Sequence, residues 1–504
     1  MLATISSATL LGAYGRAVTV EVHVAGGLPG YTVVGLPDDS CRESRDRVRA
    51  ALSSSGCGWP QQRITVNLAP SGMRKGGSGL DLAIAVGVVV ASGNLPPRTV
   101  EGFAFLGELG LDGSVRRVPG IVPLAGALAA ESVVVPAAAA HEAAVVAAGR
   151  VRPVHTLAEL LAALKGDGPW PPMPPAPDDV DPPPPLELAD VRGQEVARQA
   201  LCVAAAGGHH LLLVGSPGSG KTMLAQRLPG LLPPLDAEAA LTATIVHSAA
   251  NVALPPGGLV RQAPFRAPHH TASVVSLVGG GTPQLRPGEV SLATGGVLFL
   301  DELGEFSPSV LDALREPLEE GVVRVARARA AVDYPARLLL VAAMNPCPCG
   351  AGGPPGSCDC VPASRARYMK RVSGPLLDRF DLRLEVRRPS VSELLDARPV
   401  ETTAQAAARV ALARRRASAR GFERNADIPS RELDNLAPLS AEASRVLRTA
   451  LERGRLTGRG LHRVRRVALT VADLDGRDPP LDAAAVLTAL SMRIDPLASV
   501  RRIA

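Results

Sequence analysis

The sequence predicts an α/β fold in which a parallel sheet carries a polar site along one edge. Three short apolar runs, at 210–215, 296–300 and 337–345, end respectively in a glycine-rich turn, two acidic residues and an asparagine. Polar residues at the carboxyl ends of apolar strands are typical of ligand sites in parallel sheets. The proline-rich segment 166–187 favours an extended spacer, so we expect it to be a linker between two parts.

The composition limits the possible classes of protein. The chain has 504 residues, of which 46% are hydrophobic and 20% charged, which suits about three globular domains and excludes wholesale disorder. The net charge is only +6. Aromatic residues make up 3% of the chain, so few side chains are available to bind nucleic acid by stacking on its bases. The longest apolar runs are too short for membrane-spanning helices. We expect a soluble, cytoplasmic protein without a membrane partner.

The elements follow in order along the chain. In the N-terminal part, 1–165, we expect strands at 18–26 and 63–70 and helices at 42–56 and 80–93. After the linker, 188–395 begins with a helix pattern and contains the three apolar strands. The pattern over 396–504 is helical.

A phosphate-binding loop follows the first apolar strand. Residues 215–222 fit the P-loop pattern at every constrained position: Gly215, Ser216, Pro217, Gly218, Ser219, Gly220, Lys221 and Thr222. The glycines let backbone N–H groups turn toward phosphates at a helix start. We expect ATP as the ligand, with Lys221 on the β/γ-phosphates and Thr222 on Mg²⁺. The alternative is a glycine-rich turn that carries Lys-Thr by chance.

Two further strand ends supply candidate hydrolytic groups. In a P-loop NTPase, Asp301 is expected to bond to the Mg²⁺ shell and Glu302 to polarise the attacking water. In isolation, this acidic pair could instead cap the next helix. Asn345 is expected to bond the γ-phosphate or to position that water, the alternative being a turn residue before Pro346.

Four cysteines lie within 14 residues: Cys347, Cys349, Cys358 and Cys360. The loop between them is too rich in glycine and proline to pack by itself, and four thiolates suit tetrahedral Zn²⁺. The C-x-C spacing is tighter than that of common zinc fingers. A metal-free cysteine loop and a redox pair therefore remain alternatives to zinc.

Five stretches resemble one known family. GHHLLLVGSPGSGKTMLAQRLPGLLPPL, FRAPHHTAS, RPGEVSLATGGVLFLDEL, ARLLLVAAMNPCPCG and SGPLLDRFDLRLEV together resemble the magnesium-chelatase-like AAA+ ATPases, and within these the ComM/YifB group. The resemblance implies a P-loop AAA+ core with a helical C-terminal lid, preceded by an α+β Lon-protease-like (ChlI-type) N-terminal domain. It further implies an ATP-driven homo-hexamer. For ComM-type members it implies a branch-migrating DNA helicase in homologous recombination or natural transformation, with recombination proteins as partners.

The resemblance also implies roles for single arginines. Arg379 matches the arginine finger, which reaches the γ-phosphate of the neighbouring subunit; the alternative is a surface ion pair with Asp378 or Asp381. Arg459 matches the sensor arginine of the lid. Its neighbours at 463, 465 and 466 compete for that assignment.

The segment 322–336 lies where related enzymes carry a hairpin that points into the pore of the ring. Arg324, Arg327 and Arg329 would then face DNA phosphates, and a solvated edge hairpin is the alternative. Residues 409–466 contain 15 arginines against six acidic residues. That concentration suits phosphate-backbone contacts without base readout, or else solvated helix faces and subunit contacts.

The N-terminal domain is not expected to be an active protease. Lon-type proteases need a serine nucleophile and a lysine base. Ser78 lies near the expected serine position but one residue out of register, and the only lysine further along the domain is Lys165 beside the linker. For the whole chain, two other functions remain open: a chelatase-type motor that drives metal insertion, and a regulatory protein-remodelling ATPase.

Overall fold

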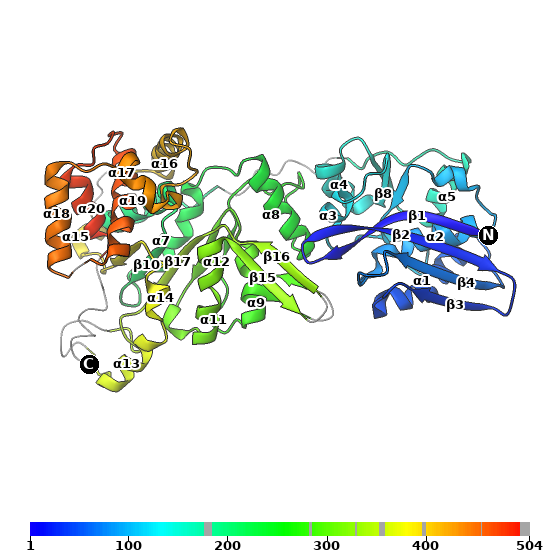
Figure 1. The fold of residues 1–504 in the computed structure, drawn as a ribbon, viewed down its shortest axis with the longest axis horizontal. Helices are drawn as coiled ribbons and strands as arrows, with labels where there is room; N and C mark the ends of the chain where they lie inside the picture. The colour runs from blue at the N-terminus through cyan, green and yellow to red at the C-terminus, as the bar shows by residue number, and fades with distance from the viewer. Residues whose placement is uncertain are drawn as a thin grey trace.

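The computed structural model describes residues 1–175, 184–281, 285–327, 330–351, 358–395, 400–454 and 456–493. They form an elongated molecule with the N-terminal part at one end, a second α/β part in the middle and a helical region at the other end (Figure 1). Among these residues, no helix is both long and apolar enough to cross a membrane.

The N-terminal part is built on a mixed seven-stranded sheet, with strand order β3-β4-β2-β1-β5-β8-β9. Its strands are β1 Leu2–Leu11, β2 Tyr14–Ala25, β3 Gly30–Val34, β4 Arg63–Ala69, β5 Phe103–Phe105, β8 Ser132–Pro136 and β9 Val151–Val154, with a separate pair, β6 Glu108–Leu109 and β7 Val115–Arg116. Its helices are α1 Asp39–Ser54, α2 Asp81–Ala91, α3 Ile121–Gly126, α4 Ala140–Ala147 and α5 Leu157–Lys165.

The strands and helices expected for this part are confirmed, and α2 is buried along its entire length. Strand β1 was missed. Its buried face is largely small residues, and it includes Ser7, whose Oγ donates to the carbonyl of Phe105 at 2.7 Å. Small and polar buried residues weaken the period-2 pattern by which a strand is recognised in a sequence.

The middle part contains a parallel five-stranded sheet of order β11-β14-β17-β10-β18, as the sequence predicts. Its strands are β10 Leu211–Val214, β11 Phe265–Arg266, β14 Val297–Leu300, β17 Leu339–Met344 and β18 Leu382–Glu385, with two hairpins formed by β12 Gly279–Gly280 and β13 Arg286–Pro287 and by β15 Val322–Arg327 and β16 Ala330–Pro335. Its helices are α6 Glu195–Gly207, α7 Lys221–Arg227, α8 Ala237–Ala249, α9 Val274–Val278, α10 Glu289–Leu292, α11 Pro308–Ala313, α12 Arg315–Glu320, α13 Pro362–Lys370, α14 Gly374–Leu377 and α15 Val391–Leu395.

Both faces of this sheet are buried, which explains its uninterrupted apolar strands. In β10, Leu211 and Leu213 pack with α6 and the C-terminal helices, whereas Leu212 and Val214 pack on the opposite face with α11 and the β15–β16 hairpin. The strands are therefore fixed from two sides, and their carboxyl ends form one edge.

The C-terminal region consists of α16 Thr403–Ala419, α17 Leu433–Leu436, α18 Ala441–Glu452, α19 Gly458–Leu474 and α20 Ala483–Ser491. It shares one hydrophobic cluster with α6 and the sheet. A buried polar contact also joins it to the sheet. The ring of His209 forms two hydrogen bonds, one between Nδ1 and Asp381 at 3.0 Å and one between Nε2 and Thr470 of α19 at 2.8 Å.

The N-terminal part docks on α8 and on the β15–β16 hairpin (Figure 1). Gly120 N–H donates to the carbonyl of Ser248 at 2.9 Å, and Arg117 donates to Asn251 at 2.8 Å. At the turn between β1 and β2, a Cβ added to Gly12 would lie 2.3 Å from Cγ1 of Val332. This close approach makes glycine necessary at the point where the two parts meet.

The linker predicted over 166–187 is described only at its ends, since 176–183 lie outside the described residues. Its first part packs on the N-terminal sheet: Trp170 stacks on Phe103 with ring centroids 5.3 Å apart. Its last residues lead directly into the first turn of the middle part, Leu188–Asp190.

Candidate functional site

The P-loop connects β10 to α7 in a conformation that requires glycine at specific positions. Gly218 and Gly220 have φ of +76° and +88°, and an added Cβ would meet nothing within 4 Å at either position. There the backbone angle selects glycine. At Gly215 the reason is close approach, because a Cβ would lie 2.2 Å from the carbonyl oxygen of Val386.

Lys221 lies inside this loop. Its Nζ donates to the carbonyls of Gly215 at 2.7 Å and Ser216 at 3.0 Å and to Oδ1 of Asn345 at 3.2 Å. Burial lowers the pKa of this lysine, because desolvation disfavours the charged form. The ammonium therefore joins the P-loop to the end of β17, and a phosphate would give it a stronger, charged partner.

The residues at the neighbouring strand ends fit a nucleotide with a hard divalent cation. Thr222 Oγ1 donates to Asp301 Oδ2 at 2.7 Å, which places a hydroxyl and a carboxylate oxygen together, as Mg²⁺ prefers. The Ser219 hydroxyl is buried without a hydrogen-bond partner among the described residues. An orphaned donor in a P-loop is the kind of group that a phosphate oxygen satisfies.

Glu302 adopts an unusual backbone conformation. Its φ is +54°, in the left-handed region that non-glycine residues rarely occupy, and its side chain is 54% exposed. Oε2 lies 2.9 Å from Nδ1 of His270, whose ring packs on that of His269 at 4.1 Å. The sequence analysis missed His270. His270 belongs to the FRAPHHTAS stretch, which begins with β11, and only the fold brings the loop after this strand to Glu302.

A cavity of about 910 Å³ opens beside the P-loop. Among its lining residues, Gln194 donates to the carbonyl of Ser219 at 3.2 Å and Arg388 to that of Pro217 at 2.9 Å. Ser491 of α20 closes it from the C-terminal region. The cavity has room for the base and ribose of a nucleotide whose phosphates lie in the P-loop. These lining residues carry no motif and were also missed.

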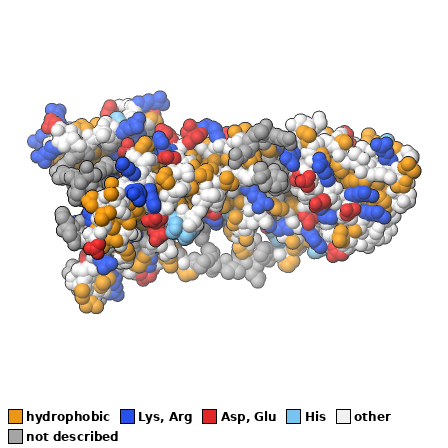
Figure 2. Space-filling model, turned by 90° about the horizontal axis from the view of Figure 1, so that it is seen from below, with side chains coloured by type: hydrophobic (Ala, Val, Ile, Leu, Met, Phe, Trp, Pro, Cys, Tyr) orange, Lys and Arg blue, Asp and Glu red, His pale blue; other side chains and the backbone are white. Residues whose placement is uncertain are grey.

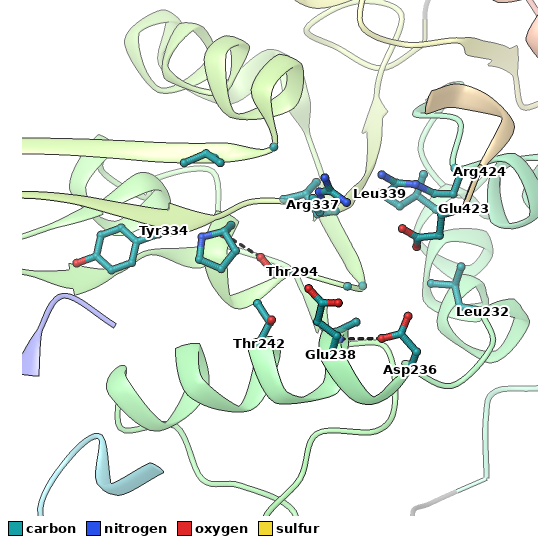
Figure 3. A pocket seen from close by; sticks show the side chains of 18 of the residues that line it. Leu232, Asp236, Glu238, Thr242, Thr294, Tyr334, Arg337, Leu339, Glu423 and Arg424 are labelled. Carbon is teal, nitrogen blue, oxygen red and sulfur yellow. Dashed lines mark hydrogen bonds between the residues drawn. The ribbon is translucent and has the colours of Figure 1, made fainter. Parts of the chain in front are cut away.

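Figure 3 shows a second cavity, of about 470 Å³, in which Asp236, Glu238, Arg337 and Arg424 are among the lining side chains. It also includes Gly296, which precedes β14. It therefore lies at the amino ends of the parallel strands, the opposite edge from the P-loop. Nucleotides bind at the carboxyl edge in such sheets, so this cavity is not the ATP site.

The four cysteines come together as the sequence predicts. All four sulfur atoms lie within 4.8 Å of one another, and those of Cys347 and Cys349 are 3.3 Å apart. Four sulfurs at Zn–S distances of ≈ 2.3 Å in a tetrahedron are about 3.8 Å apart, so the cluster fits zinc. The Arg365 guanidinium, which donates to Cys358, lowers the pKa of that thiol to about 7, which favours the thiolate that a metal needs.

Arg379 lies just before β18, at the amino edge of the sheet and therefore across it from the P-loop of its own chain. It forms an ion pair with Glu319 of α12. The expected alternative, a pair with Asp378 or Asp381, is wrong. Asp378 instead forms an ion pair with Arg383 at 3.4 Å. Asp381 pairs with Arg463 at 2.7 Å and with His209.

The lid arginines differ in their surroundings. Arg463 binds Asp381, Arg465 binds Asp434 at 2.7 Å, and Arg466 donates to the carbonyl of Ile428 at 2.7 Å. Arg459 is exposed in the first turn of α19. Of these four arginines, Arg459 is the one that has no hydrogen-bond or ion-pair partner among the described residues.

The hairpin predicted over 322–336 is confirmed as the antiparallel pair β15–β16. Arg324 is exposed and forms ion pairs with Glu320 and, at 3.1 Å, with Glu316. Arg329 and the side chain of Arg327 lie outside the described residues. On the face shown in Figure 2, basic and acidic side chains are interspersed along the molecule.

In the N-terminal part, Ser78 Oγ donates to a carboxylate oxygen of Glu108. The nearby Lys75 is buried, and its amine donates to the carbonyl of Pro70. Neither contact is the hydrogen bond from serine to a lysine base that nucleophilic catalysis requires.

Comparisons with known proteins agree over most of the chain. Residues 187–394 match the family described as magnesium chelatase, subunit ChlI, and 20–139 and 400–493 match the families described as subunit ChlI of Mg-chelatase and as magnesium chelatase, subunit ChlI C-terminal. The chain is 46% identical to the uncharacterized protein Rv2897c of Mycobacterium tuberculosis, with 97% of each chain covered. It is 41% identical both to the uncharacterized protein YifB of Escherichia coli, covering 95% of this chain and 94% of the relative, and to the competence protein ComM of Haemophilus influenzae, covering 94% of each.

Proposed function

The chain belongs to the magnesium chelatase subunit ChlI family of AAA+ ATPases, and from that premise we propose that it is a DNA-remodelling motor. Its activity would be that of a hexameric, DNA-stimulated helicase in branch migration, during homologous recombination or natural transformation. The observation that carries the hydrolytic part is the convergence of Lys221, Thr222, Asp301, Glu302 and Asn345 on one sheet edge. The DNA part rests on the likeness to a competence protein along nearly the whole chain.

Each residue of the site has a distinct role in this proposal. Lys221 binds the β/γ-phosphates, and Thr222 with Asp301 holds Mg²⁺. When bound, Mg²⁺ neutralises charge on the phosphate oxygens. Glu302 must exchange its contact with His270 for one with water before it can orient that water. Asn345 lies 3.2 Å from the lysine amine, close enough to position a group at the γ-phosphate.

The position of Arg379 supports assembly into a ring. Its guanidinium lies across the sheet from its own P-loop and can act as a finger only on a neighbouring subunit. A cavity of about 580 Å³ at that edge is lined by Arg379, Arg463 and Arg466, which gives this face several cations. We propose a homo-hexamer in which Arg379 completes the neighbour's site and Arg459 senses the nucleotide from the lid.

We propose that DNA passes along the β15–β16 hairpin, with Arg324, Arg327 and Arg329 on its phosphates. Arg324 would have to leave Glu316 and Glu320. Exposed ion pairs of this kind contribute only ≈ 0–1 kcal/mol, so DNA phosphates can displace them. The N-terminal domain holds the hairpin at Val332, and we propose that it serves assembly in the cytoplasm and has no protease activity.

For cofactors we propose ATP with Mg²⁺ and a structural Zn²⁺ in the four-cysteine cluster. For domains we propose the divisions 1–165, 166–187, 188–395 and 396–504. Strand displacement on branched DNA, together with DNA-stimulated ATPase activity of the same preparation, tests the motor. If DNA does not change the rate of ATP hydrolysis and no strand is displaced, a chelatase-type motor for metal insertion or a protein remodeller is favoured.

A further inference from the structure

The four-cysteine cluster lies between two segments of the ATP site. Cys347 comes two residues after Asn345, and Cys360 two residues before Pro362, where α13 begins. The cluster therefore ties the end of β17 to the start of α13. Anything that moves the cluster moves both segments.

On one side, the loop touches the P-loop itself. Gly350 is buried with φ of +79°, and its N–H donates to the carbonyl of Cys347 at 3.0 Å. A Cβ at this position would lie 2.6 Å from Cγ of Pro217 and 3.8 Å from Nδ2 of Asn345. The turn that presents two of the cysteines is thus in contact with P-loop residue Pro217.

On the other side, α13 reaches the turn that follows the catalytic acids. Tyr368 is 4% exposed, and a Cβ on Gly304 would lie 2.3 Å from its ring. Arg371, at the end of α13, donates to the carbonyl of Gly304 and to the carboxylate of Glu305, both at 2.8 Å. Gly304 is two residues from Glu302, so α13 fixes the segment that carries this acid.

We propose that metal binding at this cluster positions the hydrolytic groups, so that zinc loading sets the rate of ATP hydrolysis but is not needed for nucleotide binding. This inference rests on the proposed ATP site. The residues between the two cysteine pairs are rich in glycine and proline, and three of the four cysteines are half-buried or exposed, Cys347 alone being buried. A metal ion held by all four thiolates would fix the end of β17 to the start of α13.

The separation of rate from binding follows from the geometry. The phosphates would be held by P-loop backbone groups and Lys221, which β10 and α7 position, whereas the turn that carries Cys347 and Cys349 contacts this loop at Pro217. Asn345 and Glu302, in contrast, are each held by a segment that the cluster ties down. Misplacing a reacting group by about 1 Å can lower a rate by about 10²-fold, whereas binding through the P-loop persists.

The test uses full-length protein purified without chelators. We expect about one zinc per chain by elemental analysis. Removal of the metal with a chelator under reducing conditions should lower kcat by about tenfold or more. The affinity for a fluorescent ATP analogue should change by no more than about twofold. Added Zn²⁺ should restore kcat. Cys57→Ser removes a cysteine outside the cluster and should change neither zinc content nor kcat.

A second variant keeps the thiols and changes the coupling. Gly350→Ala forces a Cβ against Pro217, so we expect it to retain zinc and to lower kcat. An unchanged kcat after verified metal loss, or protein that carries a Cys347–Cys349 disulfide and no metal, would overturn the inference. If zinc-loaded wild-type protein binds the analogue but hydrolyses no ATP with or without DNA, the proposed ATPase motor fails instead.

Discussion

Lys221 and Asn345 are joined by a hydrogen bond of 3.2 Å between Nζ and Oδ1. The lysine begins α7 after β10, and the asparagine ends β17, the strand hydrogen-bonded beside β10 in the parallel sheet. Register alone brings them together, because Val214 and Met344 are paired residues at the ends of the two strands. The lysine proposed to bind the β/γ-phosphates and the asparagine expected to bond the γ-phosphate or to position the attacking water are therefore already in contact.

Glu302→Gln should bind ATP as the wild type does and lose turnover by about 100-fold or more, because the amide cannot accept a proton from water. Lys221→Ala should lose nucleotide binding, since it removes the cation on the phosphates. Fluorescent-nucleotide titration and steady-state hydrolysis measure the two effects. Normal turnover in the glutamine variant would contradict the assigned role.

Arg379→Ala should retain ATP binding while hydrolysis falls by about 10³-fold, the range attributed to arginine fingers. Mixing this variant with Lys221→Ala should restore activity, because mixed rings contain junctions with an intact P-loop and an intact finger. Glu319→Gln breaks the ion pair within the subunit and should leave hydrolysis near the wild-type level. If mixed rings form and no activity returns, the shared site is wrong.

Asp381→Asn should destabilise the contact between the sheet and the lid in a pH-dependent way. Burial raises the pKa of Asp381, but the hydrogen bond and charge of His209, together with Arg463, more than offset this and hold the pKa below its usual range. A depressed carboxyl pKa stabilises the fold above the unfolded value of about 4, and the stabilisation is lost as pH falls below it.

Urea unfolding from pH 7 to pH 3 measures this effect. The deficit of Asp381→Asn should be about 3 kcal/mol at neutral pH, the size found when a buried pair loses one partner, and should shrink in acid. Asp378→Asn is the control, because its pair with Arg383 is half-exposed. Equal deficits at every pH would contradict the ionic role of Asp381.

Arg324→Ala should weaken DNA binding to a similar extent for all sequences and reduce the slope of log affinity against log salt by about 1, the effect of one lost phosphate contact. Arg98→Ala, an exposed arginine of the N-terminal part, should leave the slope unchanged. DNA titrations at several salt concentrations provide the measurement. An unchanged slope for Arg324→Ala would remove this residue from the DNA path.

Much of this fold could be predicted because motifs and strand ends are local in sequence. The P-loop, Asp301, Asn345 and the cysteines each lie at or near the end of an apolar run, and the parallel sheet brings them to one edge. His270 could not be placed in this way, because its contact with Glu302 joins loops after two different strands. The ion pair of Arg379 with Glu319 joins residues 60 positions apart in the sequence, whereas the sequence alone suggests the acidic residues next to Arg379, Asp378 and Asp381, as its partners. Strand β1 was missed because Ser7 and small residues form part of its buried face.

The most direct test of the central claim is strand displacement on a branched DNA substrate with ATP, using Glu302→Gln as the matched control. We expect the wild type to displace the strand and to hydrolyse ATP faster when DNA is present, most strongly at low salt. The glutamine variant should bind ATP and DNA without displacing the strand. ATP hydrolysis that is unaffected by DNA, with no displacement by the wild type, would contradict the account.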